Sequence, residues 1–406
     1  MSKILISFLG TGSFQDKGAT RVYREANYLL DGKEYVTTFI SAALFRHFDC
    51  DKRIIIGTCK SMWEEYYRYF SEENGNFDES FYWKLAEFTD KAGPQSKEFP
   101  LLDELENRLK NPKIIILKYG LNDEELLFNL TKILEIDDYI ESGDELILDI
   151  THGFRSFPLF AQQIVLYLKH VSSKEITIKG FYYAMLDAMR DLGYAPVVDM
   201  NIAQHLNDWI IAASNFINKS DGSQLVGLLE DSDRNLSNLV DNFSKALNIN
   251  YSHEIKNQYE RITKYDFSEL PPLEKLMAEK AFGEFKKNFN LNKKHSLFQL
   301  DLAKWYCSKN LYGVSYLTLT EAIITFVAEK ISPSKALEED IRNSAKKTIH
   351  KNYPELGKLY KVVNKIRKNV AHMLEHRNDT YLNDIQNLDS RIEKAARLFK
   401  EYDDKQ

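Results

Sequence analysis

The segment LILDITHGFRSFPLF, residues 146–160, begins as a strand and continues as something else. Its apolar run leads directly into five residues that a hydrophobic core does not favour: Asp149, Thr151, His152, Gly153 and Arg155. The sequence then becomes apolar again. A buried strand, a polar loop and a helix in that order are typical of a parallel α/β sheet, in which ligands bind beyond the carboxyl ends of the strands. We therefore expect this polar cluster to be a ligand loop.

Apolar runs rich in β-branched residues recur along the first 198 residues. They occur at KILISFLG (3–10), RIIIGTC (53–59), KIIILKYG (113–120), DELILDITHG (144–153) and EITIKGFYYAM (175–185). Runs that are apolar on both faces indicate strands buried in a parallel sheet. Two segments between them, residues 35–48 and 154–171, are helix candidates. The alternation predicts a doubly wound α/β domain of the Rossmann kind.

The second half of the chain has a different pattern. Beyond residues 194–200 the strand-like runs stop, and helical periodicity continues to the C-terminus. Pro271, Pro272 and Pro333 interrupt this pattern. We expect three parts: an α/β domain in residues 1–198, a helical linker in 199–295 and a second all-helical domain in 296–406.

Length and composition limit the class of protein. The 406 residues are 44% hydrophobic and carry a formal net charge of −6, which supports folded cores and argues against nucleic-acid binding by the whole surface. Cys50, Cys59 and Cys307 form no CxxC pair, so neither a disulfide framework nor a structural zinc site is indicated. The opening run MSKILISFLGTG fits a strand better than a signal peptide or membrane span. We expect a cytoplasmic protein without a membrane partner.

Two loops hold the residues that we expect to bind a ligand. They are Gly10, Thr11, Gly12 and Ser13 in LGTGSF, and Asp149, Thr151, His152, Gly153 and Arg155 in DITHGFR. Glycines let the backbone approach a ligand, and hydroxyls, backbone amides and an arginine suit a phosphodiester. The first loop alone also fits a simple tight turn, and in the second Asp149 also fits a cap and His152 an interior residue. Together the two loops favour a binding site.

The pentapeptide DITHG closely resembles the motif for which the CRISPR-associated DxTHG-motif proteins are named. Three further segments resemble the same family's CARF domain: FLGTG (8–12), YREANYLLDGKEYVTTFISAAL (23–44) and YAPVVDM (194–200). This resemblance covers about half of the chain. It implies a Rossmann-like sensor domain that dimerises and binds a cyclic oligoadenylate across its two-fold axis. Such an axis suits a ring with an even number of identical units, and we expect the tetra-adenylate.

A second motif lies in KIRKNVAHMLEH, residues 365–376. Arg367 is followed after four residues by His372, which resembles the ribonuclease motif of HEPN domains. An all-helical HEPN domain downstream of a CARF domain is the arrangement of the CRISPR ancillary ribonucleases. The resemblance implies that Arg367 and His372 are catalytic, and Asn369 is a candidate supporting residue. Many relatives place Asn, Asp or His directly after the arginine, whereas this chain has Lys368.

The residue types fit RNA cleavage without a metal or other cofactor, in which the ribose 2′-hydroxyl is the nucleophile. A histidine with a pKa of about 6.5 can move the protons, and an arginine can stabilise the charge on the phosphorus centre. On a regular helix Arg367 and His372 lie about 140° apart. Either the arginine side chain wraps around the helix, or the site is assembled from two protomers, and the family implies the second.

Charge near this motif is strongly positive. Nine basic residues and one acid, Glu355, occur between Arg342 and Lys368. RNA phosphates would bind such a segment, with Lys365 and Lys368 as the predicted contacts, although a basic run also fits a solvated helix face. Glu321, on an apolar helix, fits either a buried partner of the motif or a surface position.

We therefore expect a homodimeric endoribonuclease that is activated by cyclic oligoadenylate and cleaves single-stranded RNA in CRISPR defence. Two alternatives remain open at this point. One is a sensor or regulator without ribonuclease activity, and the other is a ring nuclease that degrades the cyclic messenger itself. A nicotinamide or flavin oxidoreductase is disfavoured because LGTGSF lacks the third glycine of the dinucleotide fingerprint.

Overall fold

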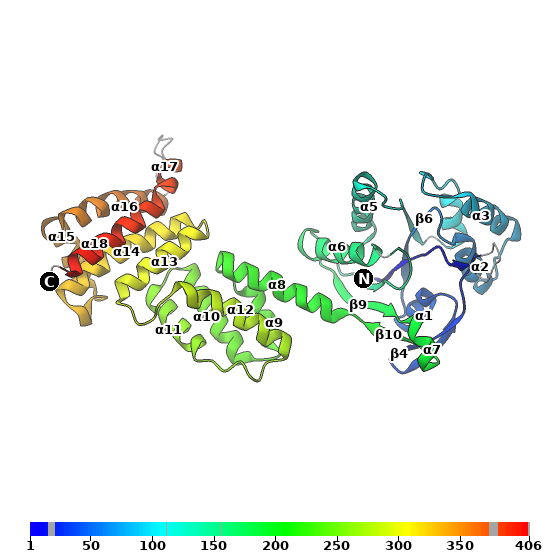
Figure 1. Ribbon diagram of the computed structural model, residues 1–406, viewed down its shortest axis with the longest axis horizontal. Helices are drawn as coiled ribbons and strands as arrows, with labels where there is room; N and C mark the ends of the chain where they lie inside the picture. The colour runs from blue at the N-terminus through cyan, green and yellow to red at the C-terminus, as the bar shows by residue number, and fades with distance from the viewer. Residues whose placement is uncertain (15–20, 111, 155, 373–380, 405–406) are drawn as a thin grey trace. The chain divides into compact units, whose positions relative to one another are not determined.

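An eight-stranded sheet lies at the centre of the N-terminal half (Figure 1). The computed structural model describes residues 1–14, 21–110, 112–154, 156–372 and 381–404. The chain divides into two compact units, Met1–Gln204 and His205–Gln406. Every described strand belongs to the first unit.

The strands are β1 Lys3–Phe8, β2 Ser13–Phe14, β3 Arg21–Val22, β4 Ala26–Leu30, β5 Lys33–Thr37, β6 Lys52–Thr58, β7 Lys113–Leu117, β8 Glu145–Asp149, β9 Thr177–Ala184 and β10 Ala195–Asp199. The main sheet has the order β5-β4-β10-β9-β8-β1-β6-β7, and β2 pairs with β3 separately. The five strands from β9 to β7 are parallel, whereas β10 is antiparallel to β9 and β5 to β4. This mostly parallel sheet confirms the predicted α/β class.

Helices cover both faces of the sheet. They are α1 Ile40–His47, α2 Trp63–Glu73, α3 Glu79–Lys91, α4 Leu102–Arg108, α5 Asp123–Leu134, α6 Phe157–His170 and α7 Met189–Leu192. Alternate residues of β1 point to opposite faces. Ile4 and Ile6 pack in one cluster with α5 and α6, whereas Leu5 packs in another with α1. Burial on both faces explains the continuous apolar runs of the sequence.

The helix expected over residues 35–48 is wrong in its first part. Residues up to Thr37 belong to β5, and α1 begins only at Ile40. The reason is the turn at Asp31 and Gly32, where both residues have positive φ, 48° and 75°. An Asp-Gly turn of this kind joins two antiparallel strands, here β4 and β5. The dipeptide was the available signal for this hairpin.

The described part of the second unit contains helices and loops only, which confirms the predicted all-helical half. The helices are α8 Asn201–Lys219, α9 Ser223–Glu230, α10 Arg234–Asn248, α11 Ser252–Thr263, α12 Pro272–Asn288, α13 His295–Ser308, α14 Tyr312–Ile331, α15 Glu339–Asn352, α16 Pro354–His372, α17 Tyr381–Gln386 and α18 Leu388–Asp404. One buried cluster joins helices α8 to α13, and a second joins α13 to α16 with α18. Among the described helices, none has the length and apolar character to cross a membrane.

A buried carboxylate fixes the start of the central strands. Asp144 is fully buried just before β8 and accepts hydrogen bonds from the backbone N–H groups of Ser2, at 2.7 Å, and Glu141, at 2.9 Å. These bonds tie the beginning of β1 to the beginning of β8. The register in which Lys3 lies opposite Glu145 therefore rests in part on this side chain.

We predict that Asp144→Ala lowers the free energy of unfolding by about 2 kcal/mol or more, because both backbone amides lose a charged acceptor. Asp144→Asn keeps one acceptor oxygen and should lose about half as much. Urea unfolding followed by tryptophan fluorescence measures both changes. Glu141→Ala, an exposed side chain on the same turn, is the matched control and should unfold as the wild type does. Unchanged stability of Asp144→Ala would contradict the role of this carboxylate.

Candidate functional site

Two loops that lie far apart in the sequence meet at the carboxyl edge of the sheet. β1 and β8 are parallel neighbours, with Ser7 opposite Asp149. The loops that follow these strands therefore leave the sheet side by side. A Cβ atom added to Gly10 would lie only 3.1 Å from the backbone nitrogen of Gly153. The fold thus brings the two predicted ligand loops into contact.

Tyr23 links the two loops. Its hydroxyl accepts a hydrogen bond from the backbone N–H of Gly10 at 2.8 Å. Its ring packs edge-on against the imidazole of His152, with ring centroids 5.1 Å apart. Burial raises the pKa of the phenol, which therefore stays protonated. A Cβ atom on Gly10 would come within 2.9 Å of this hydroxyl, so the first loop requires glycine at this position.

Both loops line a cavity of about 560 Å³. Six of the nine predicted ligand residues lie on its wall: Gly10, Thr11, Gly12, Thr151, His152 and Gly153. The rest of the wall comes from β4 with the segment that enters it and from the helical residues between β9 and β10. Its residues are Tyr23, Arg24, Glu25, Ala26, Tyr28, Leu186, Asp187, Met189 and Arg190. The cavity is large enough for a nucleotide-sized ligand.

Asp149 supports the second loop from within the protein. Its side chain is fully buried, and its Oδ1 accepts a hydrogen bond from the backbone N–H of Thr151 at 2.9 Å. The hydroxyl of Thr151 in turn accepts a hydrogen bond from the backbone N–H of Ala184 in β9, at 2.9 Å. Burial raises the pKa of Asp149 to about 6, and the hydrogen bonds with Thr151 partly oppose this shift. These contacts brace the second loop against β9.

His152 lines the cavity and has a buried, unpaired ring nitrogen. Its Nε2 atom is buried and has no hydrogen-bond partner among the described residues. Burial lowers the pKa of the imidazole to about 4, so the ring is neutral at neutral pH. A buried polar atom without a partner is costly in a folded protein. A ligand that hydrogen bonds to Nε2 would remove this cost.

Glycine is required at two further positions in the loops. Gly12 and Gly153 have φ angles of 71° and 103°, in the region that residues with a side chain rarely adopt. A Cβ atom on Gly153 would also lie 2.5 Å from the ring of Phe157 in α6. Only glycine at position 153 therefore lets the second loop lie this close to the start of α6.

The sequence interpretation missed the charged rim of the cavity. Arg24, Glu25, Asp187 and Arg190 are exposed at its edge. Within the described ranges, no ion pair joins either arginine to an acid, and a guanidinium group is a strong hydrogen-bond donor to phosphate. Arg24 and Glu25 lie in the segment that resembles the CARF domain, which was the available signal. No motif marks Asp187 and Arg190.

Two predicted ligand residues are not placed in full. Arg155 lies outside the described residues. The backbone of Ser13 begins β2, but its side chain also lies outside them. Asp149 is placed, and it lies behind the loop and not on the cavity wall.

The second predicted motif lies on α16. This helix is uninterrupted through its last residue, His372, so the Cα atoms of Arg367 and His372 lie about 140° apart around its axis. Arg367 and Asn369 are partly buried, whereas Lys365 and Lys368 are exposed. The side chain of His372 lies outside the described residues.

Exposed lysines form a basic face on α15 and α16. They are Lys346, Lys347, Lys351, Lys358, Lys361, Lys365 and Lys368. Arg342, which belongs to the same basic segment, is different. Its guanidinium is largely buried, pairs with the carboxylate of Glu321 and donates to the hydroxyl of Thr325 at 2.8 Å. The basic segment therefore consists of seven exposed lysines, the inward-facing Arg342 and the partly buried Arg367.

Two protein-family models match the chain. The CARF domain of the CRISPR system endoribonuclease Csx1 matches residues 4–187, and the second domain of CRISPR-associated protein MJ1674 matches residues 205–293. The protein MJ1674 itself, from Methanocaldococcus jannaschii, is 29% identical over 410 residues. That match covers 92% of this chain and 62% of the relative, so the chain spans less than two thirds of the relative's length.

A solved structure is also similar: Csm6 from Enterococcus italicus bound to cyclic hexa-2′-fluoro-hexa-dAMP. The match covers 99% of this chain and 95% of that one, with 14% identity and a TM-score of 0.35, which is too low to establish a common arrangement. The residues matched by the Csx1 CARF model, 4–187, include the glycine loop, the DITHG loop and strands β4 to β9. These matches support a CRISPR-associated protein with a CARF domain in residues 4–187.

Proposed function

We propose that this protein is a homodimeric, cytoplasmic endoribonuclease that cleaves single-stranded RNA when a cyclic oligoadenylate binds to its CARF domain. The observation that carries the proposal is the cavity in which the DITHG loop meets the glycine loop. In this proposal residues 1–198 are the sensor domain, 199–295 the helical connection and 296–406 a HEPN-like ribonuclease domain.

The wall of the cavity suits a phosphodiester ring. The glycine loop lets backbone amides approach the ligand, and Thr11 and Thr151 line the same wall. Arg24 and Arg190 bind the phosphates from the rim. His152 uses its unpaired Nε2 to hydrogen bond to a ribose hydroxyl or a base. Two such cavities across a two-fold axis bind a ring with an even number of adenylates, and tetra-adenylate is our proposed activator.

The proposed ribonuclease step uses protein side chains and no metal or other cofactor. The 2′-hydroxyl of the RNA attacks the adjacent phosphorus, and the 5′-oxygen of the next nucleotide leaves. His372 transfers a proton in this step, which contributes about 10²- to 10⁴-fold in typical enzymes. Arg367 stabilises the charge on the phosphorus centre, and Lys365 and Lys368 bind the flanking phosphates. Asn369 orients the RNA or the histidine.

Two protomers complete the ribonuclease site in this proposal. The angular separation of Arg367 and His372 on α16 keeps the two residues of one helix from converging by periodicity alone. The two-fold axis of the dimer places the Arg367–His372 pair of the second protomer nearby, and the two pairs together form one site. A site shared between protomers also explains regulation, because a ligand that favours one dimer arrangement controls its assembly.

A second candidate function is degradation of the cyclic messenger. The observation that favours it is His152 on the cavity wall, whose unpaired Nε2 can accept a hydrogen bond from a ribose 2′-hydroxyl and orient it. Attack of that hydroxyl on its own phosphodiester would open the ring. Loss of the cyclic species over time that persists in His372→Ala and disappears in His152→Ala would establish this activity beside the first.

We predict that His372→Ala lowers messenger-dependent RNA cleavage by about 100-fold or more, because it removes the proton-transfer group. The dissociation constant for cyclic tetra-adenylate should not change. A gel assay with end-labelled RNA and calorimetric titration measure the two quantities. The matched control is His170→Ala, an exposed histidine at the end of α6. Substantial cleavage by His372→Ala would reject the assignment of this residue.

We predict that His152→Ala raises the concentration of cyclic tetra-adenylate needed for half-maximal cleavage about tenfold, since one buried hydrogen bond to the ligand is lost. The maximal rate should stay close to that of the wild type. Arg190→Gln should act in the same direction through lost phosphate binding.

The control for Arg190→Gln is Lys84→Gln, which removes an exposed cation from α3, away from the cavity. An activation threshold that is the same in His152→Ala, Arg190→Gln and the wild type would place the messenger elsewhere.

A further inference from the structure

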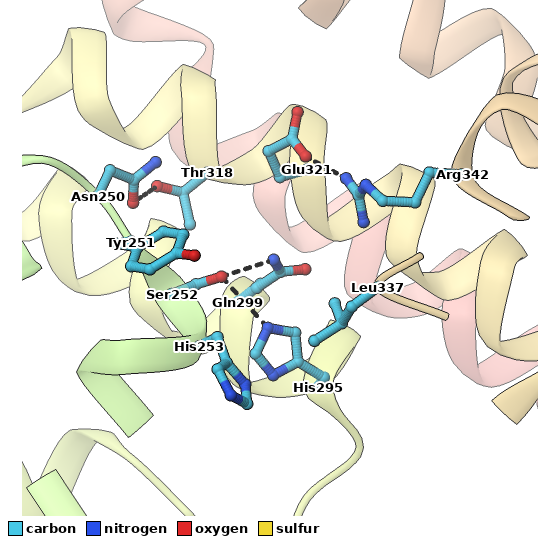
Figure 2. A pocket seen from close by; sticks show the side chains of 10 residues that line it. All are labelled: Asn250, Tyr251, Ser252, His253, His295, Gln299, Thr318, Glu321, Leu337 and Arg342. Atoms are coloured by element: carbon cyan, nitrogen blue, oxygen red, sulfur yellow. Dashed lines mark hydrogen bonds and ion pairs between the residues drawn. The ribbon is translucent and has the colours of Figure 1, made fainter. Parts of the chain in front are cut away.

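The second unit contains a polar cavity of about 500 Å³ that neither motif predicted (Figure 2). Four helices, α11, α13, α14 and α15, and two connecting loops form its wall. The lining residues are Asn250, Tyr251, Ser252, His253, His295, Gln299, Thr318, Glu321, Leu337 and Arg342. The volume is similar to that of the messenger cavity, and nine of these ten side chains are polar.

One wall of this cavity is an ordered chain of hydrogen bonds. The amide nitrogen of Gln299 donates to the hydroxyl of Ser252 at 2.9 Å, and this hydroxyl lies 3.2 Å from Nε2 of His295 (Figure 2). The amide oxygen of Gln299 points away from Ser252, toward the side of the cavity that holds Leu337 and Arg342. Gln299 is only 3% exposed, and this oxygen has no partner among the described residues. A buried acceptor without a donor indicates a place for a ligand N–H group.

The cavity is also suited to negative charge. Arg342 lies on its wall, and Lys256 is close enough to affect His295. The pKa of His295 is lowered to about 4, first by burial and then by Lys256, His253 and Arg342. Burial, the main cause of this shift, disfavours any charge, whereas the positive charges of Lys256 and Arg342 favour an anion beside the imidazole. Glu321 neutralises part of this charge through its pair with Arg342.

The cavity lies close to the helix that carries the ribonuclease motif. α14, which supplies Glu321, packs against both α15 and α16. Tyr360 of α16 lies within electrostatic range of Arg367 as well as of Glu321 and Arg342. The ion pair of Glu321 and Arg342 therefore lies between the cavity and the part of α16 near Arg367.

We propose that this cavity binds one nucleotide of the single-stranded RNA, with the base hydrogen bonded to Gln299 and a phosphate beside His253 and Arg342. The inference deepens the proposed function and rests on it for the identity of the ligand. The free amide oxygen accepts a hydrogen bond from an amino group on the base. Cytosine carries such a group, whereas uracil has a carbonyl oxygen at the same position. The site therefore prefers cytosine to uracil.

The test measures binding and not cleavage. Full-length His372→Ala serves as the parent protein, so that the RNA stays intact. Fluorescein-labelled octacytidylate and octauridylate are titrated separately, and fluorescence anisotropy gives each dissociation constant. Both oligomers lack adenine, so a preference of the messenger cavity for adenylates does not affect the comparison.

We predict that the parent binds octacytidylate about fivefold more tightly than octauridylate, because one hydrogen bond to the base contributes about this factor to the affinity. Gln299→Met, which keeps the size of the side chain, removes this difference. His253→Ala changes an exposed side chain and weakens both oligomers equally, by about threefold, while His170→Ala weakens neither.

Equal affinity of the parent for the two oligomers overturns the proposal, and so does a preference that persists in Gln299→Met. The result is independent of catalysis. A wild-type protein that cleaves no RNA with any messenger, but prefers octacytidylate through Gln299, refutes the proposed ribonuclease and retains this site. Messenger-dependent cleavage without a preference for octacytidylate retains the proposed ribonuclease and refutes this site.

Discussion

The parallel pairing of β1 with β8 is the constraint on which the proposed messenger site depends. It places the carboxyl ends of two strands, separated by more than a hundred residues, at one edge of the sheet. The buried Asp144 fixes the beginning of this pair, and the buried Asp149 holds the loop at its end through Thr151. The sheet and α6 pack together in a hydrophobic cluster on either side of the loop in sequence. The polar residues beyond Asp149 are therefore not needed for the core and can face a cavity.

Both cavities contain a buried polar atom that the protein leaves unpaired. In the first it is Nε2 of His152, and in the second the amide oxygen of Gln299. Each atom is positioned by its neighbours: Tyr23 packs against the imidazole, and Ser252 binds the amide nitrogen. A folded protein tolerates such atoms at a cost, and a ligand removes that cost when it binds. In the proposed function the first atom binds the messenger and the second binds the substrate.

The α/β class, the helical second half and the meeting of two ligand loops were predictable, because burial on both faces of a parallel sheet leaves continuous apolar runs in the sequence. The hairpin at Asp31 and Gly32 was signalled by a dipeptide but was overlooked. Arg190 and the cavity around Gln299 were not predictable. Their residues come together only when helices that are distant in sequence pack, and neither periodicity nor a motif marks them. The assignments of Arg367, Asn369 and His372 stay predictions.

The central claim is that a cyclic messenger controls RNA cleavage by one and the same chain. The most direct measurement incubates the purified full-length protein and labelled single-stranded RNA, in EDTA, with cyclic tri-, tetra- or hexa-adenylate. Our account predicts cleavage with one ring size, the tetra-adenylate, and none without a ring. Absence of cleavage with every ring would contradict the ribonuclease, and equal cleavage with and without a ring would contradict the control by the CARF domain.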